Sequence, residues 1–301
     1  MNGILVVAKP AGPTSHDVVA LVRRLAASKR VGHGGTLDPF ASGVLPLFLG
    51  GATRLVEYHL GDPKTYRATI CFGAASTTDD LDGELTPSSG PVPVREAVEA
   101  ALATLVGPQQ QQPPVYSAIQ IGGRRAYRMA RGGETPVLSP RAVTIHSLDM
   151  IEWDATDAAR PIAIVDVSCS AGTYVRALAR DLGERVGSAA YLCGLSRTAS
   201  GPFRLEDAHP LEEIRAAAAS GGPEAIESIL LPADTGLDAI ASVRLTAAEV
   251  DDAAMGRFVR PEAGLAGTPE AGPLRLLDPA GRIVGIGRRD GRRIAPDKIF
   301  A

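Results

Sequence analysis

One carboxylate, Asp38, lies in a glycine-rich stretch whose residue types could support chemistry. The stretch spans residues 31–46 and reads VGHGGTLDPFASGVLP. Its glycines lack a Cβ, so the backbone there can approach a partner closely. Pro39 disfavours helical geometry at the residue before it, and Asp38 should therefore be presented from an extended or turn segment. Such a carboxylate could act as a nucleophile or a base, although an ordinary surface turn is the alternative interpretation.

The sequence lacks the short motifs that bind nucleotide cofactors or catalytic metals. No Gly-x-Gly-x-x-Gly follows a predicted strand, and neither a Gly-Lys-Ser/Thr phosphate loop nor His-Glu-x-x-His occurs. The five histidines are scattered, at His16, His33, His59, His146 and His209. We therefore expect Asp38 to work with ordinary side chains, with no cofactor and no metal, in a redox-neutral, hydrolytic or isomerising reaction.

Charge is distributed unevenly along the 301 residues, although the net charge is only -3. Residues 115–145 carry five arginines and one glutamate, and residues 274–301 carry seven basic and three acidic side chains. Residues 205–262 are acidic, with twelve carboxylates and four arginines. Two basic patches of this kind could contact nucleic acid, whereas scattered solvated surface charge is the plainer interpretation.

The elements that must position Asp38 follow from the hydrophobic pattern. Apolar or alternating segments predict strands at 3–7, 44–49, 64–72 and 162–169. Amphipathic segments predict helices at 17–27 with Ser15 as N-cap, 53–60, 94–105, 177–186 and 245–255, and two short helices over 211–231 that are split at 221–223. Strands at 274–277 and 283–286 indicate a small β-rich module of about sixty residues, which should dock on its neighbour.

Three polar segments between these elements are interpreted as loops. The acidic cluster of Asp79, Asp80, Asp82 and Glu84 lacks calcium-loop spacing, and we expect a solvated hairpin tip there. Residues 107–114, GPQQQQPP, should interrupt secondary structure. Residues 116–141 combine tyrosines, glycine pairs and five arginines, a composition that suits a mobile arm touching phosphates and bases.

Cysteine usage and hydropathy bear on location. Cys71, Cys169 and Cys193 are odd in number and lack metal-ligand spacing, so we expect reduced, mostly buried thiols in the cytoplasm. The apolar run at 4–8 is too short for a signal-peptide core, and no transmembrane segment is predicted.

Seven segments, in order, carry a resemblance to a known family. GHGGTLDPFASGVLPL resembles the catalytic-loop motif of the TruB family, the bacterial tRNA pseudouridine synthases that isomerise uridine 55 in the T arm. The other segments that resemble the family are LVVAKPAGPTSHD, KTYRATICFG, TTDDLDGE, PPVYSAIQIGGRRAYRMARGG, CSAGTYVRALARDLG and YLCGLSRTASGPF. Gly34 and Gln120 depart from the usual threonine and lysine, which should loosen the loop slightly and remove one phosphate contact.

The resemblance implies an α+β protein with the pseudouridine synthase fold, in which helices flank a central mixed, largely antiparallel β-sheet. It implies a catalytic domain at 1–235 with an RNA-contacting arm near 113–141, followed by a small C-terminal PUA-like β-barrel at 240–301 that binds RNA. The implied partner is the T-arm stem-loop of tRNA, and a cytoplasmic monomer with no membrane association and no obligate protein partner is expected. No cofactor is implied, because the isomerisation neither gains nor loses atoms.

By resemblance Asp38 is the catalytic carboxylate, and Arg176 keeps it ionised and oriented through its charge and its fork of donors. A surface salt bridge is the alternative for Arg176. Tyr66 should stack on the target base, unless it is a core tyrosine of its strand.

Four further side chains are assigned to substrate binding by resemblance. Tyr174 and Leu195 should form walls of the base pocket, with core packing as the competing interpretation. His33 should help occupy the space that the flipped nucleotide leaves, or stabilise the loop through a hydrogen bond. Lys9 should support the loop or meet a phosphate.

Two other functions compete with this hypothesis. A non-catalytic RNA-binding protein would use the arm and the tail, with Asp38 as a turn residue only. A carboxylate-dependent glycosidic hydrolase would release free base from RNA, but such enzymes pair two carboxylates, and only the cluster at 79–84 offers a second one.

Overall fold

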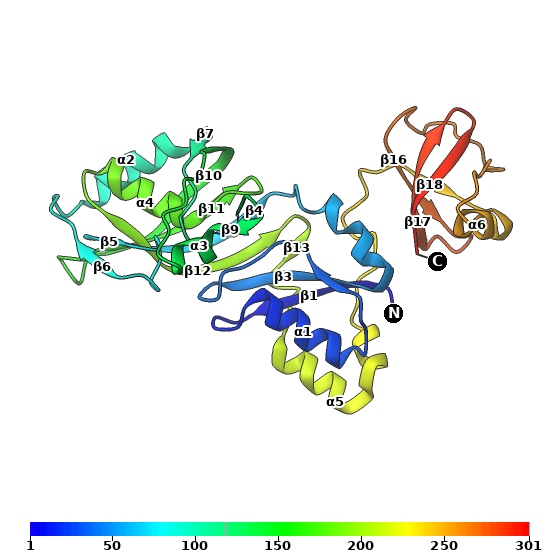
Figure 1. Ribbon diagram of the computed structural model, residues 1–301, viewed down its shortest axis with the longest axis horizontal. Helices are drawn as coiled ribbons and strands as arrows, with labels where there is room; N and C mark the ends of the chain where they lie inside the picture. Colours follow the sequence, from blue (N-terminus) through cyan, green and yellow to red (C-terminus); the bar gives the residue numbers. More distant parts are fainter. Residues whose placement is uncertain (118, 301) are drawn as a thin grey trace.

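Alternating apolar residues build the strands of a large sheet in the computed structural model of the chain, which describes residues 1–117 and 119–300 (Figure 1). β4 (Lys64–Phe72) and β11 (Ile162–Cys169) have the bounds that their alternation predicts. The ten strands of this sheet are β1 (Gly3–Lys9), β2 (Val31–His33), β3 (Ser42–Leu49), β4, β7 (Gly107–Gln111), β10 (Arg141–Asp154), β11, β12 (Ala190–Ser200), β13 (Phe203–Arg204) and β14 (His209–Pro210).

The sheet is mixed and largely antiparallel, as expected. Its hydrogen-bonded order is β14-β1-β3-β12-β4-β11-β10-β7, with β2 paired to β3 and β13 paired to β12. Only the β1–β14 and β3–β12 pairs are parallel within the described sheet. The central strands β3, β12 and β4 therefore come from three distant parts of the sequence.

Helices flank the two halves of the sheet. In Figure 1, α2 and α4 lie together beside β10 and β11, and α1 and α5 lie together at the β1 end. The helices are α1 (Ser15–Leu25), the 3-10 helix η1 (Gly50–Tyr58), α2 (Arg95–Leu105), α3 (Ala126–Arg131), α4 (Val175–Arg185), α5 (Leu211–Glu227) and α6 (Ala247–Ala254). α5 is kinked at Gly222, where φ is 60°, and this confirms the predicted split. No helix of the described residues is long and apolar enough to cross a membrane.

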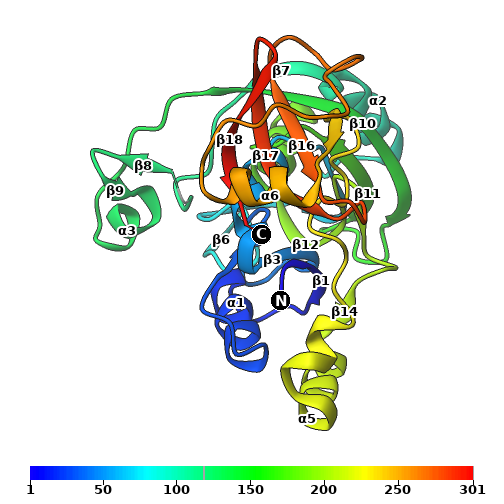
Figure 2. The ribbon, with the colours of Figure 1, turned by 90° about the vertical axis from the view of Figure 1, so that its right-hand side faces the viewer.

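The arm consists of α3 with the hairpin of β8 (Gln120–Ile121) and β9 (Arg124–Arg125). It extends away from the sheet as a separate projection (Figure 2). The segment expected to break secondary structure before it was misread, because residues 107–111 form strand β7 at the edge of the sheet. A run of glutamines carries no alternation, so its pairing with β10 could not be read from the pattern.

The C-terminal residues form a second, four-stranded sheet in the order β15 (Ser242–Arg244), β16 (Pro273–Leu277), β17 (Ile283–Asp290) and β18 (Arg293–Ile299). The described strands pair in this linear order and form an open sheet, so the predicted barrel is not confirmed. The expected docking is observed: Ile286 and Phe300 join an apolar cluster with Phe48 and Leu55 of the large-sheet half.

The expectation of three free thiols was wrong. Cys71 and Cys193 form a disulfide across β4 and β12, while Cys169 is free and buried. Their separation of 122 residues hides this contact in the sequence, and the register shift between Leu192 and Gly194 accompanies it. The argument for a cytoplasmic location from three reduced cysteines therefore fails.

The N-terminus of α1 holds the Asp38 loop. Thr14, not the predicted Ser15, is the N-cap, and its hydroxyl accepts a bond from the Asp17 amide at 3.1 Å. Ser15 is buried and its Oγ accepts from the Leu37 amide at 2.9 Å and donates to the Leu37 carbonyl at 3.1 Å. One hydroxyl thus satisfies both backbone groups of the residue before Asp38.

Ser15→Ala should free the loop backbone at Leu37. The free energy of unfolding should fall by roughly 1–3 kcal/mol, because two buried polar groups lose their partner, and amide exchange in a peptide covering residues 34–41 should accelerate. Thr14→Ala, the control, removes the cap for about 1 kcal/mol and should leave that exchange unchanged. Urea denaturation and hydrogen-exchange mass spectrometry measure both effects, and equal exchange in the two variants would contradict the role given to Ser15.

Candidate active site

The strand register places Lys9, Arg197 and Tyr66 in one row across the sheet. Lys9 and Tyr66 were predicted as site residues, whereas Arg197 was not. Lys9 lies opposite Gly43, Gly43 opposite Arg197, and Arg197 opposite Tyr66, across β1, β3, β12 and β4. The Asp38 loop leads directly into β3, one residue before Gly43, and therefore lies beside this row.

Lys9 supports the Asp38 loop through hydrogen bonds to backbone carbonyls. Its Nζ donates to the carbonyl oxygens of Pro10 at 2.9 Å, Pro13 at 2.8 Å and Pro39 at 3.3 Å. Burial lowers the pKa of Lys9 to about 8, although the charge of Asp38 opposes this shift. With its ammonium group engaged in this way and 1% of its surface exposed, Lys9 cannot reach a phosphate in this conformation.

Asp38 forms an ion pair with Arg176, the partner assigned to it. Oδ2 of Asp38 lies 3.0 Å from Nε of Arg176, and the Asp38 side chain keeps 37% of its surface exposed. The same guanidinium lies 3.0 Å from Asp80, and the side chains of Arg176 and Asp80 are only 6% and 5% exposed. One buried cation therefore serves one buried and one accessible carboxylate.

The prediction of a solvated hairpin tip at the acidic cluster was wrong for its first two members. Asp80 accepts from Arg176, from the hydroxyl of Thr78 at 2.5 Å and from the Asp82 amide at 3.1 Å. Asp79 lies 2.8 Å from Arg180. The sequence could not show this, because 96 residues separate Asp80 from Arg176.

The two arginines also bind the root of the arm. Arg176 Nη2 donates to the Tyr116 carbonyl at 3.0 Å, and Arg180 Nη2 donates to the Gln112 carbonyl at 2.9 Å. The ion-pair network around Asp38 is thus continuous with the segment that leads into the arm.

The electrostatic balance at Asp38 differs from the expectation. Burial raises the pKa of Asp38 above its ordinary value of 3.8, and Arg176 opposes the shift while Asp80 adds to it. Arg176 favours the charged form, as expected, but does not outweigh desolvation. The result is a carboxylate that is more basic than usual.

Tyr66 lies on β4 within the main apolar core. Leu195 lies on the neighbouring strand β12 and packs against that core. Tyr66 is 9% exposed. Burial raises the pKa of Tyr66, and the charge of Asp38 contributes in the same direction, so the two groups lie within electrostatic reach. Leu195 pairs with Ala68 and is partly exposed.

Tyr174 and His33 form no described hydrogen bond with Asp38. Gln111, which sequence reasoning missed, donates to the Tyr174 carbonyl at 3.1 Å and accepts from its amide at 2.8 Å. The Arg141 guanidinium lies 5.4 Å from the centre of the Tyr174 ring. His33 is half-buried and its Nδ1 accepts from the Gly35 amide at 3.3 Å, the loop bond that was the alternative for this residue.

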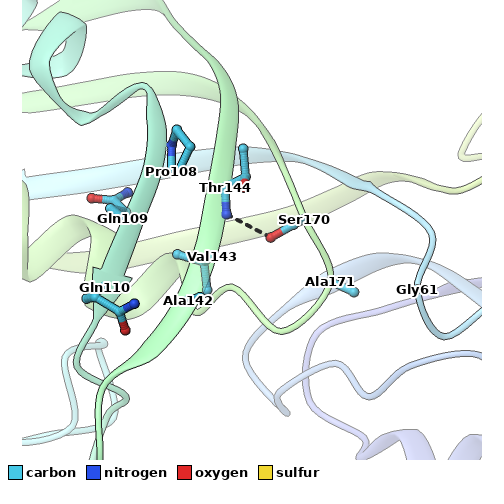
Figure 3. A pocket seen from close by; sticks show the side chains of 9 residues that line it. All are labelled: Gly61, Pro108, Gln109, Gln110, Ala142, Val143, Thr144, Ser170 and Ala171. Carbon is cyan, nitrogen blue, oxygen red and sulfur yellow. Dashed lines mark hydrogen bonds between the residues drawn. The ribbon is translucent and has the colours of Figure 1, made fainter.

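A surface pocket of about 560 Å³ lies between β7, β10 and the turn at Ser170 and Ala171 (Figure 3). The Ser170 hydroxyl accepts from the Thr144 amide at 2.9 Å in its wall. Its lining includes none of the predicted site residues. Elsewhere in the described parts of the chain, no group of three or more His, Cys, Asp or Glu side chains is arranged to hold a metal ion.

Curated relatives match the chain over its whole length. Proteins named tRNA pseudouridine synthase B from Synechococcus elongatus, Arthrobacter sp. and Bradyrhizobium diazoefficiens are 44%, 41% and 39% identical to it. The alignments cover 100% of this chain in all three cases, and 98%, 97% and 86% of the respective relatives.

Solved structures share the fold. A chain of a Cbf5-Nop10-Gar1 complex aligns with a TM-score of 0.73 and 24% identity, over 99% of this chain and 85% of that one.

Residues 23–175 match the model of the TruB family pseudouridylate synthase N-terminal domain, and residues 176–238 match the tRNA pseudouridylate synthase B C-terminal domain. Together with the full-length relatives, these matches show that the chain belongs to the TruB family of pseudouridylate synthases.

Proposed function

We propose that this chain converts uridine to pseudouridine at position 55 in the T arm of tRNA. The observation that carries the proposal is the accessible Asp38 carboxylate, paired with the buried guanidinium of Arg176. The names of the full-length relatives, tRNA pseudouridine synthase B, support tRNA as the substrate.

Asp38 is the catalytic residue of the proposed reaction. The reaction breaks the bond between N1 and C1′, rotates the base and joins C5 to C1′, while a proton leaves C5 and another is taken up at N1. Asp38 acts as a nucleophile at the base or the sugar, or as the base that starts elimination at the sugar, and each role needs the ionised form. Arg176 orients the carboxylate and favours that form.

The remaining assigned residues surround the flipped nucleotide in this proposal. Tyr66 stacks on the target base, with Tyr174 and Leu195 as further walls of its pocket. His33 occupies the space that the nucleotide leaves, and Lys9 supports the loop. Extruding the base costs a few kcal/mol, which contacts to the RNA backbone must offset.

Those contacts come from the arm and the tail. We assign residues 1–235 to the catalytic domain, residues near 113–141 to an RNA-contacting arm, and residues 240–301 to a PUA-like RNA-binding domain. The basic balance of both segments and the projection of the arm from the sheet support this division (Figure 2). In this proposal the protein acts in the cytoplasm as a monomer without an obligate protein partner.

Asp38→Asn should abolish pseudouridine formation while RNA binding survives. Loss of the carboxylate should lower the single-turnover rate on an unmodified tRNA transcript by at least about 10³-fold, with an unchanged shape at the site. Asp82→Asn, an exposed member of the acidic cluster, is the matched control and should turn over normally at neutral pH. Mapping of pseudouridine in the T loop and filter binding measure the two effects; release of free uracil, or turnover by Asp38→Asn, would contradict the proposal.

Acid should inactivate the enzyme at a higher pH than an ordinary aspartate would allow. Burial raises the pKa of Asp38, so the single-turnover rate should fall through a midpoint above 3.8. The charge of Asp80 adds to that shift, and Asp80→Asn should therefore move the midpoint to lower pH. Asp82→Asn should move it less, because its charge contributes less. A midpoint that rises in Asp80→Asn would disprove the assigned electrostatics.

Arg128→Gln should weaken RNA binding in a salt-dependent way. Arg128 is exposed on α3 of the arm, and loss of one phosphate contact should reduce the slope of log affinity against log salt by about 1. Arg95→Gln is the control, since Arg95 is an exposed arginine on α2 paired with Glu99. The single-turnover rate at saturating RNA should be unchanged in both. Identical slopes for the two variants would remove the arm from the RNA-binding surface.

A further inference from the structure

Arg197 is a buried cation that pairs with no carboxylate among the described residues. It lies on β12 with 1% of its surface exposed, among the largest fully buried side chains of the protein. Within residues 1–117 and 119–300 it forms hydrogen bonds to backbone carbonyls but no ion pair. Burying an unpaired charge costs free energy. Core packing alone therefore does not explain an arginine at this position.

The carbonyls that Arg197 binds belong to the Asp38 loop and to the strand after it. Nη2 donates to Gly35 at 3.1 Å, Nη1 contacts Thr36 at 3.5 Å, and Nε donates to Val44 at 2.8 Å. The planar guanidinium spreads its donors over three nitrogens in fixed directions, whereas an ammonium group donates from a single nitrogen, so a lysine at this position would not reach all three carbonyls. Arg197 therefore ties the loop, two and three residues before Asp38, to the first half of β3.

The other neighbour of Arg197 is Tyr66, directly opposite on β4. Side chains of directly paired residues on adjacent strands project from the same face of the sheet, and the charge of Arg197 lowers the phenol pKa against the larger effect of burial. A single side chain thus binds the loop that carries Asp38 and lies beside the ring proposed to stack on the target base.

The backbone of Arg197 is itself held in place. Gly43, its partner on β3, has a φ of 110°, and a Cβ there would lie 2.2 Å from the Arg197 carbonyl oxygen. This close approach requires glycine. The β12 backbone is therefore pressed against β3 at the point from which the Arg197 side chain extends.

We propose that Arg197 is a positioning residue for the isomerisation, setting the distance and angle between the Asp38 carboxylate and the Tyr66 ring. The proposal rests on the proposed function, because it needs Asp38 and Tyr66 to act on one nucleoside. Arg197 does not touch the RNA, since it is buried, and acts through these two neighbours. A displacement of about 1 Å in such a pair can cost roughly 100-fold in rate.

The test compares Arg197→Lys and Arg197→Met with Arg67→Lys in the full-length protein on an unmodified tRNA transcript. Arg67 is an exposed arginine of β4 paired with Asp166, and its variant should keep the wild-type rate. Arg197→Lys keeps the charge but not the fork, so its single-turnover rate should fall by about 100-fold, with RNA affinity within about 3-fold of wild type (under 1 kcal/mol). Arg197→Met should fall at least as far, and Arg197→Lys remains informative if Arg197→Met does not fold.

A double-mutant cycle with Tyr66→Phe separates positioning from general stability. If Arg197 acts through the Tyr66 hydroxyl, the rate losses of Arg197→Lys and Tyr66→Phe should not add. Folded Arg197 variants with the wild-type rate, or losses in rate that merely follow losses in RNA affinity, would overturn the inference alone. An inactive wild-type protein would instead overturn the proposed function, and this inference with it.

Discussion

The sharing of one buried guanidinium between two carboxylates is the interaction on which the site depends. Arg176 and Asp80 form an almost fully buried ion pair, and removal of either partner would leave an uncompensated buried charge. Asp38 occupies a second edge of the same cation but remains partly exposed. Because Asp80 already balances the charge of Arg176, the attraction left for Asp38 is weakened, and burial can raise its pKa. This arrangement yields a carboxylate that is oriented by Arg176 and more basic than a surface aspartate.

The ion-pair network around Asp38 also reaches the arm. Arg176 and Arg180 donate to the carbonyls of Tyr116 and Gln112, at the root of the segment proposed to contact RNA. The bond from Arg176 uses Nη2, which neither Asp38 nor Asp80 contacts. A change in the path of the arm would therefore alter the surroundings of Arg176, which the loop at Asp38 also contacts. The arm proposed to contact RNA and the Asp38 carboxylate are thus linked through Arg176 by one hydrogen bond and one ion pair.

Local patterns predicted much of the fold, whereas contacts between distant segments escaped them. The alternation of β4 and β11, the glycine–proline split of α5 and the loop position of Asp38 follow from neighbouring residues. The Arg176–Asp38 pair came from a family resemblance. Asp80, Gln111 and the Cys71–Cys193 disulfide were misread, because each has a partner at least 60 residues away, on an element whose adjacency depends on the sheet order.

The loop at Asp38 is held by buried side chains in addition to backbone bonds, such as the one from the Ala41 amide to the Asp38 carbonyl. The side-chain bonds come from Lys9 to Pro39, from Ser15 to Leu37 and from Arg197 to Gly35 and Thr36. Each donor is a polar group buried at a free-energy cost that an apolar residue would not incur. Apolar residues, however, could not satisfy carbonyls at defined positions, and an unsatisfied buried carbonyl costs about as much. Such residues therefore contribute placement of the backbone around Asp38 more than net stability, and this is the property that chemistry on an extruded nucleoside requires.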